Sequence, residues 1–375
     1  MKTLDPVKSQ EILSDLYACA SCGYCRFGCP VYQQVGFERI APRGRIQALK
    51  RSLEARTDVP ESLRESIYMC LQCENCEVQC PVSIDFPKIA VKVAEMFNDA
   101  DELPTGAQAM KDQIHALGNP YGKTREERAE WMPKHENKAG RDILYFVGCG
   151  ASYGSTRIPR SITKILDDIG LEYNVLGEEE NCCGAPLQRI GDADGAQKMI
   201  EKNTAKFREL GAKTIFANCA GCFKTLLHSY PQEFEALHVS QFMLRLVEEG
   251  RVQFKKNLDV KAIYFDGCDI GRHSNVYEEP RNLLKTIPGL ELLEYDYNRE
   301  QAMCCGGPLL SSMPDLAQEI AADRVREAAA KGAEMIVTPC PTCMLNLKQG
   351  AKAAGLKMKI EDLPMILPSL LEKKK

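Results

Sequence analysis

The sequence predicts a chain of mixed α and α/β architecture, in which a helical N-terminal module precedes two copies of a small α/β domain with a parallel sheet. Two observations predict this division. The first hundred residues place apolar side chains at helical spacing, whereas the rest of the chain contains one pattern of strands, helices and cysteines twice. We place the helical module at 1–100, a connector at 101–140, and the two copies at 141–258 and 259–375.

The N-terminal module is expected to be helical rather than rich in strands. Apolar residues at helical spacing predict helices over Ile46–Leu53, Leu63–Met69 and Ile89–Phe97. The module also contains eight of the eighteen cysteines of the chain.

These eight cysteines form two runs with the spacing C-x2-C-x2-C-x3-C-P, which is the bacterial ferredoxin signature. In this signature, three cysteines of a run bind one [4Fe–4S] cube and the fourth reaches the other cube. Zinc, which favours separated C-x2-C pairs, is the less favoured alternative. The predicted ligands are Cys19, Cys22, Cys25 and Cys80 for the first cluster, and Cys70, Cys73, Cys76 and Cys29 for the second.

The connector is rich in charged residues and contains the only tryptophan, Trp131. Pro104, Gly106, Pro120 and Gly122 interrupt regular structure there. We expect a linking segment with helical pieces.

The remaining sequence is a duplication. The cysteines Cys149 and Cys268 lie 119 positions apart, the vicinal pairs that begin at Cys182 and Cys304 lie 122 apart, and similar segments before the last C-x2-C pairs lie 121 apart. Three anchors at nearly one offset indicate a repeated domain.

Within the first copy the apolar period changes from strand-like to helical and back. Ile143–Val147, Leu171–Leu176 and Thr214–Ala217 predict strands, and the intervening segments predict helices, the first of which stops at Gly170. Such alternation predicts a parallel sheet with its ligands at the carboxyl ends of the strands. Because each group of cysteines follows a predicted strand, we expect a metal at the strand tips of each copy.

Each copy has five cysteines, one more than a cubane uses as terminal ligands. The fifth implies an opened or fused cluster with bridging sulfur, or a cysteine that is not a ligand. Mononuclear zinc is the simpler alternative, and a vicinal disulfide is disfavoured by strain. The two sets are Cys149, Cys182, Cys183, Cys219 and Cys222, and Cys268, Cys304, Cys305, Cys340 and Cys343.

Composition excludes several classes of function. A net charge of −4 and a pI of about 5.9, without a long basic tract, argue against nucleic-acid binding. No apolar run approaches the length of a membrane-spanning helix, and Met1–Asp15 lacks the apolar core of an export signal. We expect a cytoplasmic protein that reaches a membrane only through a partner.

The doubled pattern C…CCG…CxxC resembles the cysteine-rich "CCG" domains of the heterodisulfide reductase family, and the fused ferredoxin module resembles that family's D-type chain, which joins C-like and B-like parts. The Arg-Gly-Arg segment of the family is present at Pro42–Arg45. The resemblance covers nearly the whole chain except the connector. One departure is Gly267, where relatives often have proline before the cysteine.

The resemblance implies two cubane clusters and two noncubane [4Fe–4S] clusters, one of which zinc would replace in the alternative assignment. It implies that a thiol-derived disulfide such as CoM-S-S-CoB is reduced, or formed, between the noncubane clusters. The partner would be a membrane b-type cytochrome, a flavoprotein or another iron–sulfur subunit. No G-x-G-x-x-G fingerprint follows a strand, so flavin or NAD would belong to the partner.

A second hypothesis is a relay without its own substrate. Iron–sulfur subunits of glycolate, lactate or glycerol-3-phosphate oxidising enzymes and of electron-transfer-flavoprotein systems resemble this chain as well. The sequence does not choose between the two hypotheses, nor does it give the substrate, the direction of electron flow or the oligomeric state.

A few other polar residues are candidates. His273, beside Arg272, and Lys224 follow cysteines of the duplicated domains closely enough to reach a bound anion or thiolate. Arg39, Arg43 and Arg45 are candidates for a docking patch that faces an acidic redox partner.

Overall fold

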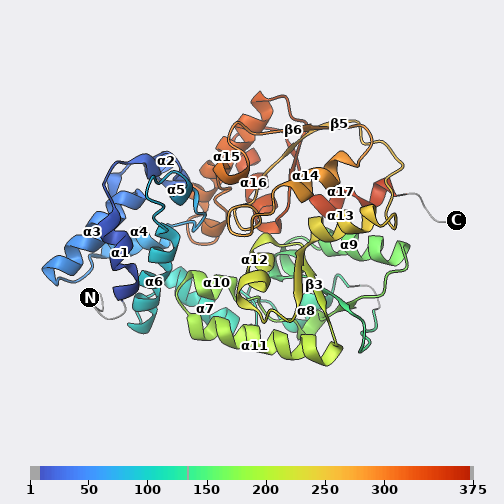
Figure 1. Cartoon of the computed structure of the whole chain (residues 1–375), viewed down its shortest axis with the longest axis horizontal. Helices are drawn as coiled ribbons and strands as arrows, with labels where there is room; N and C mark the ends of the chain where they lie inside the picture. The colour runs from blue at the N-terminus through green and yellow to red at the C-terminus, as the bar shows by residue number, and fades with distance from the viewer. Residues whose placement is uncertain (1–8, 133–134, 372–375) are drawn as a thin grey trace.

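A computed structural model describes residues 9–132 and 135–371. Figure 1 shows three bodies: the helical module, drawn in blue, lies beside two α/β domains, one in green to yellow and one in orange to red. The predicted fold class is confirmed, because helices make up the N-terminal body and each of the other two contains a four-stranded parallel sheet.

Short helices build the N-terminal body around its own apolar core. The three predicted helical segments lie in α3, α4 and α6, and Asp85 caps the N-terminus of α6, where its carboxylate accepts the backbone N–H of Lys88. The apolar face of α6 packs against Ile12 and Leu16 of α1. The helices are α1 (Gln10–Ala18), α2 (Pro30–Val35), α3 (Pro42–Ala55), α4 (Glu61–Tyr68), α5 (Asn75–Val78) and α6 (Phe86–Asp99).

The connector contains two helices, α7 (Thr105–Leu117) and α8 (Arg125–Ala129). A capping box of Thr124 and Glu127 begins α8. Trp131 is 3% exposed, and the backbone N–H of Cys182 donates to the carbonyl of Gly118 at 2.7 Å. The connector is therefore packed against the first α/β domain along much of its length.

The first α/β domain has the strand order β2-β1-β3-β4, all parallel. The three predicted strands are present, although the second is limited to two residues. The edge strand β4 was not predicted, because only its last two residues are buried and it carries no apolar run. The elements are β1 (Ile143–Phe146), α9 (Arg157–Asp168), β2 (Asn174–Val175), α10 (Ala185–Arg189), α11 (Ala193–Leu210), β3 (Thr214–Ala217), α12 (Ala220–Ser229), β4 (Glu235–His238) and α13 (Val239–Glu248).

The second α/β domain repeats this topology, with the strand order β6-β5-β7-β8. Its edge strand β8 is the equivalent of β4. The elements are β5 (Val260–Tyr264), α14 (Glu278–Lys285), β6 (Leu290–Leu293), α15 (Pro314–Ala330), β7 (Met335–Thr338), α16 (Pro341–Ala353), β8 (Lys359–Asp362) and α17 (Leu363–Ile366).

The two α/β domains share one continuous apolar core. His238, at the end of β4, is fully buried, and its Nε2 lies 2.9 Å from the carbonyl oxygen of Pro339 in the other domain. Phe254, after α13, and Leu371, after α17, form an antiparallel bridge that joins the C-terminal segments of the two domains. Across 9–132 and 135–371, no helix combines the length and apolarity that crossing a bilayer requires.

Candidate metal centres and the cavity between them

The electrostatic neighbours of the module's cysteines lie mostly within the two predicted sets, although Cys76 also has Cys25 of the other set among its neighbours. Cys25 has Cys19, Cys22 and Cys80 as electrostatic neighbours, so the fourth thiol comes from the other run. The second group is more deeply buried, and desolvation raises the pKa of Cys29 to about 12. Cys22 is exposed. The second group consists of Cys29, Cys70, Cys73 and Cys76.

The five thiols of the first α/β domain contact one another in an unbroken series. The first follows β1, the vicinal pair lies in the loop after β2, and the last two lie at the junction of β3 and α12. Gly148 has φ +76°, and a Cβ there would lie 2.9 Å from Sγ of Cys222, so the backbone closely approaches that thiol. The series runs Cys149, Cys182, Cys183, Cys222 and Cys219.

The second α/β domain forms an equivalent series at the tips of β5, β6 and β7. The sulfur atoms of Cys305 and Cys343 are 3.1 Å apart. A Cβ on Gly307 would lie 3.2 Å from Sγ of Cys305, which again places backbone against a thiol. The series runs Cys268, Cys304, Cys305, Cys343 and Cys340.

Two contacts join these series to each other and to the helical module. The thiols of Cys219 and Cys340 meet across the boundary between the α/β domains. The thiol of Cys304 contacts that of Cys73, and this hydrogen bond is the main reason that the pKa of Cys73 is lowered to about 6. A continuous series of sulfur atoms therefore runs from the second group of the module through the second domain to the first.

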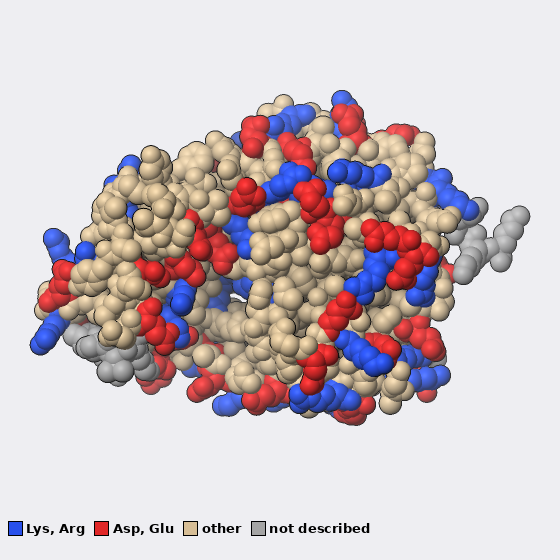
Figure 2. Space-filling model, in the orientation of Figure 1, with Lys and Arg blue, Asp and Glu red and all other residues tan. Residues whose placement is uncertain are grey.

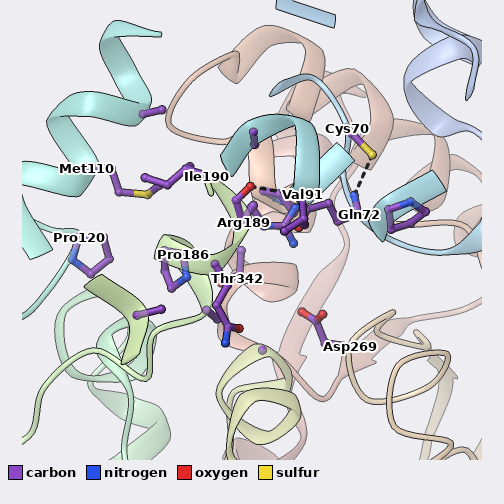
Figure 3. Close-up of a pocket in the computed structure, with 18 of the residues that line it drawn as sticks. Cys70, Gln72, Val91, Met110, Pro120, Pro186, Arg189, Ile190, Asp269 and Thr342 are labelled. Atoms are coloured by element: carbon purple, nitrogen blue, oxygen red, sulfur yellow. Dashed lines mark hydrogen bonds between the residues drawn. The ribbon is translucent and has the colours of Figure 1, made fainter. Parts of the chain in front are cut away.

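A cavity of about 1190 Å³ lies where the three bodies meet. Nine of the ten cysteines of the α/β domains line it, and Cys304 is the exception. Figure 2 shows the hollow in the surface at this place, and Figure 3 shows Gln72 and Arg189 reaching toward each other along its wall. Gln72 Nε2 donates to the carbonyl of Arg189 at 3.0 Å. Residues of α6, α7 and α10, among them the apolar Val91 and Met110, also line the cavity.

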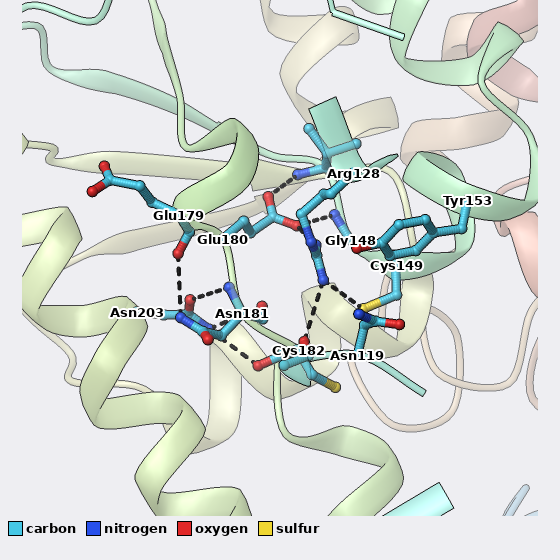
Figure 4. Close-up of polar contacts among 12 residues, drawn as sticks. Asn119, Arg128, Gly148, Cys149, Tyr153, Glu179, Glu180, Asn181, Cys182 and Asn203 are labelled. Carbon is cyan, nitrogen blue, oxygen red and sulfur yellow. Dashed lines mark hydrogen bonds and ion pairs between the residues drawn. The ribbon is translucent and has the colours of Figure 1, made fainter. Parts of the chain in front are cut away.

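Arg128 of the connector contacts the first cysteine of this thiol series (Figure 4). The Nη2 atom of Arg128 donates to Sγ of Cys149 at 3.1 Å, and Nη1 lies 2.5 Å from Glu180 Oε1. Glu180 also accepts the backbone N–H groups of Val147 and Gly148, at 2.8 and 2.9 Å. Sequence reasoning missed Arg128, because nothing in a charged stretch distinguishes a buried arginine from its exposed neighbours.

Comparison with known proteins agrees with this geometry. Residues 143–227 and 262–348 each match the family model described as "Cysteine-rich domain", and 15–84 match "4Fe-4S dicluster domain". The chain is 31% identical to the D chain of dihydromethanophenazine:CoB–CoM heterodisulfide reductase of Methanosarcina mazei, an alignment that covers 94% of this chain and 93% of the relative. The chain belongs to the HdrD family of heterodisulfide reductase chains.

More distant relatives extend the comparison. The EtfAB:quinone oxidoreductase of Syntrophomonas wolfei is 27% identical over 96% of this chain, which spans 59% of that relative. The probable iron–sulfur-binding oxidoreductase FadF of Bacillus subtilis is 28% identical, with 60% of its length covered. A hypothetical protein from Helicobacter pylori, at 10% identity and a TM-score of 0.65, covers 98% of this chain and shares its fold. This chain is thus an iron–sulfur oxidoreductase related to HdrD, and its dicluster domain implies two cubanes.

The residues around the thiols fit the anionic clusters that the HdrD family implies. Arg45 is 1% exposed and lies among the second cysteine group, where its charge acts on Cys29 and Cys70. Its Nε and Nη2 atoms are buried and have no hydrogen-bond partner among the described residues. A buried cation of this kind requires a nearby anion. The predicted docking role of Arg45 is therefore wrong: α3 turns this side chain inward, whereas Arg39 is exposed and Arg43 pairs with Glu38.

The two polar candidates lie in the wall of the cavity and belong to one ionic network. Lys224 Nζ lies 3.0 Å from Oδ1 of Asp269, and His273 Nδ1 lies 2.6 Å from Oε1 of Glu74 in the module. Burial opposes ionisation of Asp269, but Lys224 and His273 nevertheless hold its pKa below the usual value. No sequence signal pointed to Asp269, which follows a cysteine but forms no motif.

Proposed function

We propose that this chain is a heterodisulfide reductase-like enzyme that passes electrons from a redox partner to a thiol-derived disulfide bound in the central cavity. The observation that supports this proposal most directly is that thiols of both sets, nine of the ten, line a single cavity and that the sets touch at Cys219 and Cys340. A site for a relay alone does not require two such sets to face one chamber. We further propose that all eighteen cysteines bind iron–sulfur clusters.

The chain supplies positions for each part of the reaction. The exposed Cys22 places the first cubane site near the surface, where a partner protein has access. The contact between Cys73 and Cys304 gives a path into the second α/β domain. When bound, the clusters supply single electrons and iron atoms that accept a thiolate. Reduction of the disulfide consumes two electrons and two protons and yields two thiols.

The cavity lining offers the substrate both charged and apolar contacts. Lys224 and Arg189 are among its cations, and we propose that Lys224 and His273 position an anionic or thiolate group of the substrate. Val91, Met110 and Ile190 contribute apolar surface, which suits an aliphatic arm. A disulfide such as CoM-S-S-CoB fits this combination. We also propose a cytoplasmic location with attachment to a membrane only through a partner.

The experiment is disulfide turnover by protein purified without oxygen, with reduced viologen as donor and CoM-S-S-CoB or other thiol-derived disulfides as acceptors. Iron and acid-labile sulfide are counted on the same sample. We expect two thiols for each pair of electrons and a thiol-dependent paramagnetic signal from the α/β domains. Absence of turnover with every disulfide, in fully loaded protein, would contradict the proposal.

The alternative is a relay for a flavoprotein, which the similarity to EtfAB:quinone oxidoreductase and FadF favours. In that case reduced electron-transfer flavoprotein would reduce the clusters rapidly, and thiols would leave the paramagnetic signals unchanged. The same sample, mixed first with the flavoprotein and then with thiols, therefore separates the two functions.

A further inference from the structure

Arg272 occupies the junction between the helical module and the second α/β domain. Its Nε donates to the carbonyl of Cys73 at 2.5 Å, and Nη1 donates to the carbonyls of Glu300 and Ala302 at 3.1 and 2.5 Å. One side chain thus joins a cysteine loop of the module to the segment that precedes the vicinal pair beginning at Cys304.

Among the described residues, no carboxylate forms an ion pair with Arg272. Within the described part of the chain, its hydrogen bonds go to neutral carbonyls, no ion pair with an acidic side chain is formed, and its buried Nη2 atom has no hydrogen-bond partner. By contrast, the buried Arg281 pairs with Asp266 and Glu294. A desolvated cation is costly unless an anion lies nearby.

The groups nearest to Arg272 that would be anionic as cluster ligands are three thiols. Cys73, Cys268 and Cys304 all lie within the electrostatic range of its guanidinium. The first belongs to the second cysteine group of the module, and the other two belong to the series of the second α/β domain. The guanidinium therefore lies between the two places where adjacent clusters would be held.

We propose that Arg272 is a positioning residue that raises the midpoint potentials of the two centres it separates, and so stabilises an electron on either side of the Cys73–Cys304 contact. The proposal rests on the proposed function, because it requires clusters at these cysteines. In the step concerned, a centre held by Cys73 and its neighbours in the module would lose one electron, and a centre held by the second α/β domain would gain it. Because a fixed positive charge favours the more negative, reduced form, it raises both potentials.

The test is a redox titration, followed by electron paramagnetic resonance, of the full chain purified without oxygen. Arg272→Gln removes the charge but keeps a polar side chain. At a fixed ambient potential, we expect the ratio of reduced to oxidised centre to fall at least about tenfold at both sites, which equals 59 mV for one electron. The first cubane and the centre of the first α/β domain should keep their wild-type potentials.

Arg272→Lys separates charge from structure, because it keeps the charge and loses the forked hydrogen bonds. At the same ambient potential, we expect the ratio of reduced to oxidised centre at both sites to stay within about threefold of the wild-type ratio. Arg189→Gln is the matched control. Arg189 also crosses to the module, donating to the carbonyl of Leu71 at 2.7 Å, but it comes from the first domain, so its loss should leave the centre of the second domain unchanged.

Unchanged potentials in fully loaded Arg272→Gln would overturn the proposal, as would an equal fall in Arg272→Lys. If Arg272→Gln does not fold, Arg272→Lys is the deciding variant. Wild-type potentials in Arg272→Lys would support the role of the charge, and a tenfold fall in its ratio of reduced to oxidised centre would contradict that role. Failure of the proposed function is distinguishable, because it would appear in the wild-type protein as missing iron and sulfide or as absent disulfide turnover.

Discussion

The two α/β domains share a strand order and a five-cysteine pattern, yet they balance buried charge in different ways. In the first, Arg128 contacts Cys149 and pairs with Glu180, and this arginine comes from the connector. In the second, Arg281 of α14 pairs with Asp266 inside the same domain. The first domain therefore depends on a segment outside the repeat for its electrostatics, whereas the second does not.

The domains also differ in how they meet the helical module. A thiol of the second, Cys304, contacts Cys73 directly, whereas the first domain reaches the module through polar contacts of Arg189. Domains with the same fold thus lie at unequal distances from the helical module. In the proposed function, in which electrons enter through the module, the second domain would be adjacent to the donor and the first would be distal.

Removal of equivalent cysteines tests the proposed order of the two domains and has the largest expected effect. We expect Cys304→Ala to slow reduction of the intact centre in the first domain at least about 100-fold. This effect would exceed the loss that follows when a residue that only hydrogen-bonds to a metal ligand is removed. Cys182→Ala, the matched change, should leave reduction of the second domain at its normal rate. Rapid mixing with reduced viologen and freeze-quench paramagnetic resonance measure both rates. Equal effects of the two changes would refute the proposed order.

A second test uses the arginine that the first domain takes from the connector. Arg128→Met leaves Glu180 buried without its cation, so we expect the free energy of unfolding to fall by about 3–5 kcal/mol. Hydrogen exchange should show lost protection in β1 and unchanged protection in β5. Arg128→Met combined with Glu180→Gln should recover much of the loss, because no uncompensated carboxylate remains. If β5 loses as much protection as β1, the domains are not electrostatically independent.

The edge strands give a comparison that depends on pH. β4 ends in His238, whose pKa burial lowers to about 4, and β8 ends in Asp362, whose pKa burial raises well above its usual value. Because the folded-state pKa of His238 lies below its unfolded value, neutral His238 contributes fully to the free energy of unfolding above about pH 6.5, and this contribution is lost as pH falls toward 4. We expect the free energy of unfolding to fall by a few kcal/mol over that window.

The contribution of Asp362 to stability depends on pH in the opposite direction. Its folded-state pKa lies above the unfolded value, so its contribution is present at low pH and is lost as pH rises. Asp362→Asn should therefore stabilise the chain at neutral pH, by about 1 kcal/mol or more, and His238→Asn should flatten the acid limb. Denaturant unfolding from pH 4 to 8 measures both. An unaltered acid limb in His238→Asn would contradict the assignment.

The smallest effect is expected at the glycines before the first cysteines. Gly148 has a positive φ and lies against Sγ of Cys222, whereas Gly267 lacks a positive φ, and the nearest atom to a Cβ there would be 3.4 Å away. Gly148→Ala should cost about 1–2 kcal/mol of stability, and Gly267→Ala much less. Thermal melts of the two variants would settle the difference, and equal melting temperatures would disprove it.

Local pattern was enough to predict much of this molecule. The parallel sheets and the repeat follow from apolar periodicity and spacing, which are properties of neighbouring residues, whereas the assignment of cysteines to clusters stays a prediction. β4 and β8 were missed because short edge strands bury little. The contacts of Cys219 with Cys340 and of Cys73 with Cys304 depend on how separate bodies pack, and no spacing encodes that. Arg45 was misplaced for the same reason, since a helix pattern does not tell which neighbour its polar face meets.

The loop of the module from Met69 to Gln72 forms one side of the central chamber. A pair of α/β domains without the module would therefore expose its cysteine thiols to bulk water on the side that this loop covers. We expect such a pair to be more sensitive to air than the full chain.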